Sequence, residues 1–327
     1  MRILLIGDGP WAANSLAPLL DAGHEIVGVA LRAQPSDESL AAAAKSLNIA
    51  VFQPENVNSQ EFVGDVKALN LDLGLSISCN QIMRSQLLGA ANKGFVNFHA
   101  GKLPRYRGRN VINWAIINGE REIGLTAHFV DAGIDTGDVI LQRTLPIEWT
   151  DGYGDVLDRV VEHFPEFVLD AVSRIERGET EGKPQSSAAG TYFCGRGDGD
   201  EWLDWSACSK DIYNKIRGID RPGPGARTTR GDATVKVWKA TFDPSWPEYI
   251  ATPGQVVGRG NDGVTVKTGD STILIREVQI DDGPCQIPKW PIGTRLGIDP
   301  YQMIRALETR IAALERQIQT NEGSEIS

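Results

Sequence analysis

Short apolar runs alternate with amphipathic stretches over the first hundred residues of the chain. Such runs predict buried strands, and they lie at Ile3–Ile6, Ile26–Leu31, Leu73–Ser78 and Gly94–Phe98. Helices are expected from the Gly7–Pro10 loop through Leu20, over Asp37–Leu47 with Ser36 or Asp37 as the N-cap, and over Ser85–Ala91. Strands alternating with helices predict an α/β fold, a Rossmann-like and mostly parallel sheet with helices on both faces.

A long helix is predicted from Gly154 to Gly178, because apolar residues recur there at helical spacing. These residues are Val156, Val160, Phe164, Phe167, Val168, Ala171 and Ile175. Pro165 lies inside the pattern and is expected to bend the helix or split it in two. The apolar face is expected to pack in the core.

The pattern changes after residue 181. Residues 182–200 are rich in Gly, Ser and Asp and predict a linker between a first domain, residues 1–181, and a second domain, residues 201–285. Glycine-spaced strands follow at Thr234–Lys239, Gly254–Gly258, Gly263–Lys267 and Thr272–Gln279. Such spacing is typical of a small antiparallel β-barrel, OB-like, or of a sandwich.

A terminal helix is predicted over residues 299–320. Its apolar residues recur at spacings of three and four, with Glu and Arg between them: Ile304, Leu307, Ile311, Leu314 and Ile318. Two heptads are short for a coiled coil, so a homodimer through this helix and packing against its own chain are both open.

Composition is typical of a globular protein with two domains, because 327 residues with 41% hydrophobic content can bury a sizeable core. The cysteines, at positions 79, 194, 208 and 285, show neither close pairing nor metal-ligand spacing. Reduced thiols, no bound metal and a soluble, cytoplasmic protein are therefore expected. No apolar stretch is long enough to span a membrane, and Met1–Gly7 is too short for a signal peptide.

The net charge of −10 argues against extensive contact with a phosphate backbone. Nucleic-acid binders usually display a basic face, although a local basic patch can exist on an acidic protein. The charge therefore disfavours a nucleic-acid partner and leaves small-molecule substrates.

Polar side chains follow two of the apolar stretches. Asn97 and His99 are two residues apart in an extended segment, so they point to the same face. Asp131 and Asp135 lie in a glycine-containing turn between further apolar stretches. Strand ends and the loops after them are where α/β enzymes place their chemistry.

An amide, an imidazole and a carboxylate in one site suit acyl transfer to an amine. Asn97 can donate a hydrogen bond to the developing oxyanion, and His99 can take the surplus amine proton. A carboxylate can orient the imidazole and stabilise its charged form. The alternative is structural: Asn97 caps a turn, and His99 is a half-buried residue with satisfied hydrogen bonds.

A longer pattern includes these residues. It reads Asn97-Phe-His-(x)3-Leu-Pro-x-Tyr-Arg-Gly-Arg-Asn, followed by Asp131-(x)2-Ile-Asp-Thr-Gly-Asp. This pattern closely resembles the formyltransferase family, whose methionyl-tRNA and sugar-nucleotide enzymes take the formyl group from 10-formyltetrahydrofolate. The resemblance extends more loosely from about residue 1 to 280. It implies that Asn97, His99 and Asp135 are catalytic.

The resemblance also implies a folate site. The pterin is expected to contact backbone groups of the loop Cys79–Met83 and of the turn Asp131–Asp135, with apolar contact from one leucine. The residues implied as folate ligands are Gln81, Ile82, Met83, Leu103, Asp131 and Ile134.

Two departures from the tRNA enzymes guide the prediction of the acceptor amine. Those enzymes have a basic insertion after the second strand. The corresponding segment of this chain, residues 32–40, is short and contains one arginine. They also usually read Ser-Leu-Leu-Pro where this chain has Gly101-Lys-Leu-Pro104. With the acidic charge, these departures favour a dTDP-, UDP- or GDP-linked amino sugar of surface polysaccharide (lipopolysaccharide) biosynthesis. A methionyl-tRNA formyltransferase, a formyltetrahydrofolate hydrolase and a small-molecule amine acceptor are the alternatives.

Contacts to this acceptor are expected from the glycine-rich loop and from a cationic segment that could bind a pyrophosphate. The predicted residues are Gly9, Pro10, Trp11, Lys102, Arg105 and Arg107, with Arg109 in the same cationic cluster. Some of the cations could instead bind the glutamate of the folate or form ion pairs with neighbouring residues. The glycine-rich loop could simply form a turn, with no contact to substrate. NAD binding is disfavoured, because Pro10 and Trp11 replace the third-glycine pattern.

Overall fold

The structure is a computed structural model that describes residues 1–33, 37–179, 182–297 and 300–324. It contains two compact units, Met1–Asp200 with Arg217–Gly223, and Glu201–Ile216 with Pro224–Ser327. The predicted Ser36 cap, the predicted boundary at residue 181 and the predicted helix start at residue 299 lie outside the described residues.

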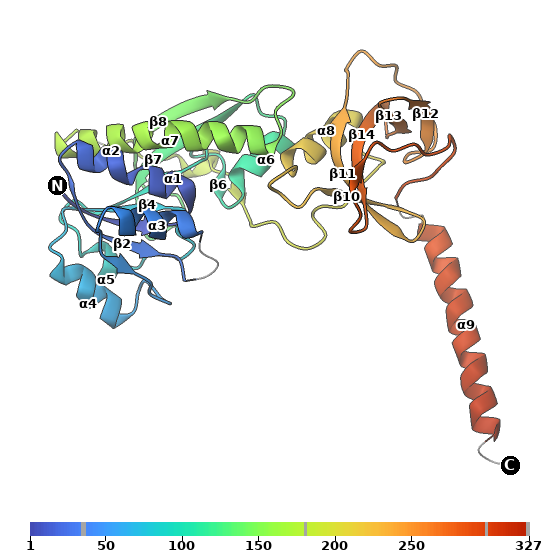
Figure 1. Ribbon diagram of the computed structural model, residues 1–327, viewed down its shortest axis with the longest axis horizontal. Coiled ribbons are helices and arrows are strands. Elements are labelled where there is room, and N and C mark those ends of the chain that lie inside the picture. Colours follow the sequence, from blue (N-terminus) through green and yellow to red (C-terminus); the bar gives the residue numbers. More distant parts are fainter. Residues whose placement is uncertain (34–36, 180–181, 298–299, 325–327) are drawn as a thin grey trace. The chain divides into compact units, whose positions relative to one another are not determined.

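The first unit is built on a seven-stranded sheet with the order β3-β2-β1-β4-β5-β7-β8 (Figure 1). Its strands are β1 Arg2–Gly7, β2 Glu25–Leu31, β3 Val51–Phe52, β4 Leu73–Ile77, β5 Phe95–His99, β7 Glu122–Phe129 and β8 Val139–Pro146. The strands β1 to β5 pair in parallel, and β7 pairs antiparallel with both β5 and β8. The prediction of a mostly parallel, Rossmann-like sheet is confirmed.

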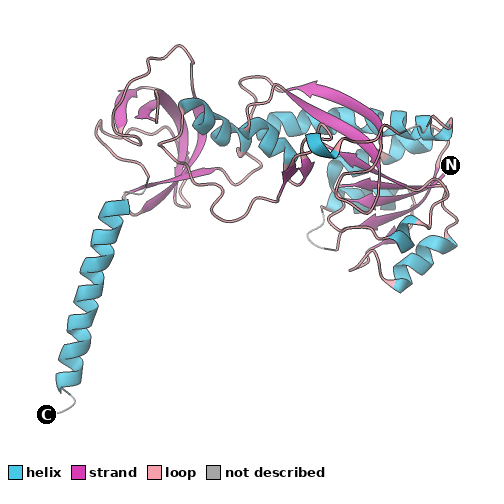
Figure 2. Ribbon diagram, turned by 180° about the vertical axis from the view of Figure 1, so that it is seen from behind, coloured by secondary structure: helices cyan, strands magenta, loops and turns pink. Residues whose placement is uncertain are grey.

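Helices cover both faces of this sheet, as Figure 2 shows from behind. They are α1 Gly9–Asn14, α2 Leu16–Asp21, α3 Glu38–Ser46, α4 Gln60–Ala68, α5 Ser85–Leu88, α6 Val111–Ile117 and α7 Tyr153–Glu176. Alternate residues of β1 enter different cores: Ile3 and Leu5 pack with α1, α2, α3 and α7, and Leu4 and Ile6 pack with α4 and α5. This alternation is the period-two pattern of a strand buried on both faces.

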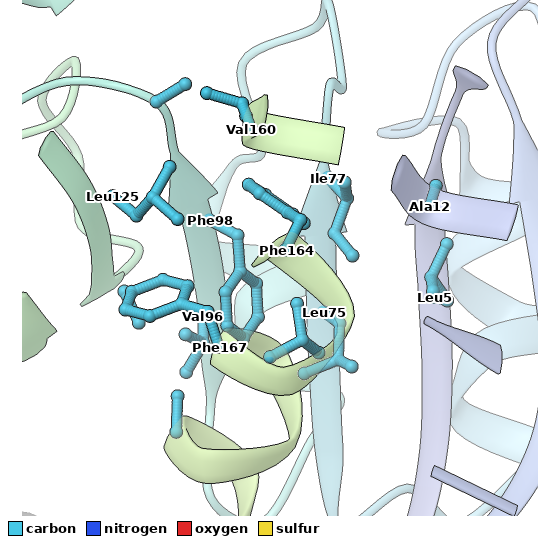
Figure 3. Packing of buried hydrophobic residues seen from close by; sticks show 14 of the residues in the cluster. Leu5, Ala12, Leu75, Ile77, Val96, Phe98, Leu125, Val160, Phe164 and Phe167 are labelled. Atoms are coloured by element: carbon cyan, nitrogen blue, oxygen red, sulfur yellow. The ribbon is translucent and has the colours of Figure 1, made fainter. Parts of the chain in front are cut away.

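The long helix α7 continues through Pro165 without a break, so the expected split is wrong, and the expected bend stays a prediction. Figure 3 shows Phe164 and Phe167 of α7 beside Phe98 of β5, with ring centroids 6.3 and 6.1 Å from that of Phe98. An interior proline costs about 3 kcal/mol, whereas burying each phenylalanine contributes about 1.5–3 kcal/mol. Core packing therefore outweighs the local penalty.

The segment after α7 joins the first unit through two short pairings. Lys183 forms an antiparallel bridge with Val139, and β9, Tyr192–Phe193, pairs in parallel with β6, Arg107–Gly108. The stretch predicted as a linker therefore contacts the loop after β5.

The second unit contains an antiparallel sheet in the order β10-β11-β14-β13-β12, with β15 paired to β14. Its elements are α8 Ser209–Gly218, β10 Ala226–Arg230, β11 Ala233–Thr241, β12 Val256–Gly260, β13 Gly263–Lys267, β14 Thr272–Ile280, β15 Cys285–Gln286 and α9 Pro300–Ser324. The small antiparallel domain is confirmed, but no pairing between β10 and β12 closes a barrel among the described strands. None of the described helices is long and apolar enough to cross a membrane.

Candidate active site

A pocket of about 810 Å³ lies where the parallel strands β1, β4 and β5 of the first unit end. It is lined by Trp11 after β1, by Ser78 after β4, and by Asn97 and His99 of β5. The strand order reverses between β1 and β4. Ligands of α/β sheets bind at the carboxyl ends of strands beside such a reversal.

Asn97, His99 and Asp135 meet in this pocket. The Asn97 Nδ2 atom donates a hydrogen bond to Asp135 Oδ1 over 3.2 Å. His99 Nδ1 lies 3.7 Å from Asp135 Oδ2. The structure thus brings together an amide and an imidazole from one strand and a carboxylate from a turn 38 residues further along the chain.

The tautomer of His99 follows from its second contact. His99 Nε2 lies 2.6 Å from the carbonyl oxygen of Tyr106, which can only accept, so Nε2 carries the hydrogen. Gly101 permits this approach, because a Cβ there would lie 2.4 Å from His99 Nε2. Burial lowers the pKa of His99 below its ordinary value, although the Asp135 carboxylate opposes the shift. At neutral pH, Nδ1 is therefore an unprotonated base beside a carboxylate.

Asp135 is held by a turn that few residues could form. Its own φ is +53°, a left-handed conformation that Asp tolerates better than most residues. The Gly108 N–H donates to Asp135 Oδ2 over 2.8 Å from a backbone with φ +97°. Burial raises the pKa of this carboxyl, but its contacts with His128, His99 and the Gly108 N–H outweigh burial and lower the pKa to about 2. Asp135 is ionised at neutral pH.

His128 is a fourth polar residue of the site, and sequence reasoning missed it. It pairs with Asn97 in the β5–β7 register, and its Nε2 lies 3.2 Å from Asn97 Nδ2 and 3.4 Å from Asp135 Oδ1. Its Nδ1 lies 2.8 Å from the Phe129 carbonyl oxygen, so Nδ1 carries a hydrogen. The Asn97 amide nitrogen thus lies between the Asp135 carboxylate and the His128 ring. The sequence signal that could have identified His128 is its position inside an otherwise apolar strand, because a buried polar side chain needs a hydrogen-bond partner.

Most of the predicted folate ligands line the pocket: Gln81, Ile82, Met83, Asp131 and Ile134. Ile82 and Ile134 are 62% and 50% exposed, although they are large apolar side chains. Leu103 is buried and does not line the pocket. Two exposed isoleucines in one pocket offer an apolar surface for a flat ring.

The predicted acceptor contacts are placed differently. Trp11 lines the pocket, its ring 5.3 Å from that of Phe164, whereas Gly9 and Pro10 form the start of α1 and do not. Three of the cations, Lys102, Arg105 and Arg107, also lie outside the pocket lining, and Arg109 is the cluster member that lies within it.

The three outlying cations contact protein groups. Lys102 pairs with Glu122, and Arg105 pairs with Glu120 at 2.8 Å, both on the exposed surface. Ion pairs with neighbours, the alternative left open for these cations, are what the structure contains.

Arg107 is buried and supports the turn that contains Asp135. It donates to Gln185 Oε1 over 2.8 and 3.2 Å and to the Tyr192 hydroxyl over 3.1 Å. Gln185 in turn donates to the carbonyl oxygens of Asp135 and Gly137, over 3.0 and 2.7 Å. Arg107 therefore reaches the site through Gln185.

The site contains no metal-binding arrangement among the described residues, since no group of three or more His, Cys, Asp or Glu side chains there could hold an ion.

Comparison with known proteins gives two family matches. Residues 1–172 match the model described as formyl transferase, and residues 198–290 match the formyl transferase C-terminal domain. The methionyl-tRNA formyltransferase of Symbiobacterium thermophilum is 36% identical over 85% of this chain and 88% of its own length. That of Alkaliphilus oremlandii is 31% identical over 94% of this chain and 98% of its own.

Solved structures share the fold. WlaRD, a sugar 3N-formyl transferase, has 20% identity and a TM-score of 0.68, covering 84% of this chain and 97% of its own. HypX from Aquifex aeolicus has 21% identity and a TM-score of 0.59, and this chain spans 44% of its length. Identities this low support a common fold and say nothing of the substrate.

These comparisons correct the predicted acceptor. Relatives that are 30–36% identical over most of the chain are methionyl-tRNA formyltransferases, so the prediction of a nucleotide-linked amino sugar in lipopolysaccharide biosynthesis is wrong. The prediction rested on two local departures from the tRNA enzymes and on the net charge, which averages over the chain. Residues 1–200 contain seventeen Lys and Arg against twenty-six Asp and Glu, whereas residues 201–297 contain thirteen against twelve.

Proposed function

This chain belongs to the formyltransferase family, and we propose that it transfers the formyl group of 10-formyltetrahydrofolate to the amino group of methionyl-tRNA. The family is folate-dependent, which confirms the co-substrate that the sequence resemblance implied. The convergence of Asn97, His99 and Asp135 in one pocket carries the proposal for the chemistry.

The residues of the pocket fit a folate. A pterin is flat and has both hydrogen-bonding edges and apolar faces. Ile82 and Ile134 supply exposed apolar surface, and the neighbouring segments Cys79–Met83 and Asp131–Asp135 supply backbone groups at the pocket. When bound, the folate would supply the formyl group that is transferred.

The three polar residues then divide the work of the transfer. The acceptor nitrogen bonds to the formyl carbon, the bond from that carbon to the folate nitrogen breaks, and the amine releases a proton. His99 Nδ1 takes this proton, directly or through water, because it is unprotonated at neutral pH. The departing folate nitrogen receives a proton in exchange, so that tetrahydrofolate is released. Asp135 stabilises the resulting imidazolium from 3.7 Å.

Asn97 is positioned to stabilise the negative charge that develops on the formyl oxygen. Its amide nitrogen is held between Asp135 and His128 at 3.2 Å from each, so one N–H must turn from its protein acceptor to the oxyanion. A single donor of this kind typically contributes a factor of about 10²–10³ to turnover.

Support for methionyl-tRNA as the acceptor comes from the relatives and from the distribution of charge. Residues 201–297 have nearly equal numbers of basic and acidic side chains. The acidic excess of the chain therefore lies mainly in residues 1–200, and local basic groups in residues 201–297 can contact phosphates.

The test is tetrahydrofolate release from 10-formyltetrahydrofolate with a panel of acceptors. The panel comprises methionylated initiator tRNA, the same tRNA without methionine, a dTDP-linked amino sugar and buffer. Turnover with methionyl-tRNA alone, falling as salt rises, is the expected result. Turnover with the amino sugar and none with methionyl-tRNA would overturn the acceptor, and equal release in buffer would overturn the transfer itself.

A further inference from the structure

The helix α9 carries exposed apolar side chains beyond the residues that the family models match. It spans Pro300–Ser324, whereas the second match ends at residue 290. Ile304, Leu307, Ile311 and Leu314, which we call the α9 seam, are between 43% and 55% exposed. Four large apolar residues at this exposure on one helix mark an interaction surface.

The spacing and identity of the seam residues select one kind of partner. They are separated by three, four and three positions, so they occupy a and d of a heptad. Ile304 and Ile311 take position a, and Leu307 and Leu314 take position d. Isoleucine at a with leucine at d favours a parallel coiled coil of two strands.

The charges beside the seam are complementary between two parallel copies. Arg310 occupies position g and Glu315 the e position of the following heptad. In a parallel dimer, a g residue lies beside the following e residue of the other helix. Arg310 of each copy would therefore meet Glu315 of the other. An antiparallel pairing would set e against e and place glutamates together.

We propose that the α9 seam is a homodimerisation surface through which two copies of this chain form a parallel, two-stranded coiled coil. The partner is a second copy of the chain, because the apolar seam and the charges beside it on one helix match those on an identical parallel helix. The proposal does not depend on the catalytic assignment, since α9 lies outside both family matches.

The first test is the mass of the full chain by sedimentation equilibrium over a range of concentrations. The expected mass is twice the 35.6 kDa of one chain, falling to one chain in the seam variant Ile311→Lys/Leu314→Lys. The matched control is Thr309→Lys/Ala312→Lys, which adds the same charge to exposed positions outside the seam and is expected to remain dimeric. A wild-type chain that is monomeric at every concentration, as packing on its own chain would give, overturns the proposal.

A charge-reversal pair tests the parallel register. Arg310→Glu alone and Glu315→Arg alone each place like charges across the interface, so each should dimerise more weakly than wild type. Mixing the two variants restores opposite charges in a heterodimer, which should form more tightly than either homodimer. Equal dimerisation of the single variants and the mixture would contradict the parallel arrangement.

Discussion

The strand end Asn97–His99 and the loop Lys102–Arg107 are close neighbours in sequence, but their polar side chains contact different things. Asn97 and His99 face the pocket and the Asp135 carboxylate. Lys102 and Arg105 pair with glutamates on the surface, and Arg107 is buried against Gln185. A strand imposes the direction of alternate side chains, whereas a loop does not. Of these two segments, only the strand residues could therefore be placed from the sequence.

The first prediction tests the pocket side of this comparison. Asn97→Ala, His99→Ala and Asp135→Ala should each lower kcat by about a hundredfold or more, because each removes an interaction made in the transition state. Circular dichroism should show that each variant is folded. Near-normal turnover in all three folded variants would mean that the chemistry lies elsewhere.

The second prediction concerns the buried member of the loop. Arg107→Ala removes hydrogen bonds to Gln185 and Tyr192 and should lower the free energy of unfolding by about 2 kcal/mol, measured by denaturant titration. Arg105→Ala is the control, because an exposed ion pair contributes less than about 1 kcal/mol. Equal stability of the two variants would show that burial does not distinguish these arginines.

The third prediction uses the protonation states of the site. Since the pKa of His99 is lowered, its neutral form persists below pH 6.5, and kcat/KM should fall by about tenfold per pH unit only under that pH. Asp135 opposes this lowering, so Asp135→Asn should move the inflection to still lower pH. The acceptor amine also titrates, equally with the wild type and with Asp135→Asn. The informative quantity is therefore the difference in inflection pH between the two enzymes. An inflection that does not move, or moves up, would contradict the assignment of His99.

The fourth prediction, with the smallest effect, separates the cations. Arg109 is exposed and lines the pocket, so Arg109→Ala should raise KM for an anionic substrate by about five- to tenfold, as expected for one charge-assisted contact. Lys102→Ala and Arg105→Ala should change KM by less than about twofold. A larger rise in KM for Lys102→Ala or Arg105→Ala than for Arg109→Ala, measured by steady-state kinetics, would show that the surface cations contact the substrate.

Much of the fold could be predicted because periodicity encodes burial. Residues 3–6 read as a buried strand, and α7 followed from its helical repeat of apolar residues. Pro165 was judged from local cost alone, and the packing of Phe164 and Phe167 could not be weighed without the tertiary structure.

The site was predictable only in part. Strand alternation placed Asn97 and His99 on one face, and the family pattern added Asp135. His128 was missed because its role depends on the antiparallel pairing of β7 with β5, which the local sequence does not specify. The predicted acceptor was wrong because it was inferred from two local departures, at residues 32–40 and 101–104, and from the net charge, which says nothing of where the charges lie.

The most direct test is to measure the formyl-methionyl-tRNA formed from 10-formyltetrahydrofolate by the wild-type chain, Asn97→Ala and Arg105→Ala. The account predicts product from the wild type and from Arg105→Ala at similar rates, and at least about a hundredfold less from Asn97→Ala. Undiminished product from folded Asn97→Ala, or no product from the wild type, would contradict it.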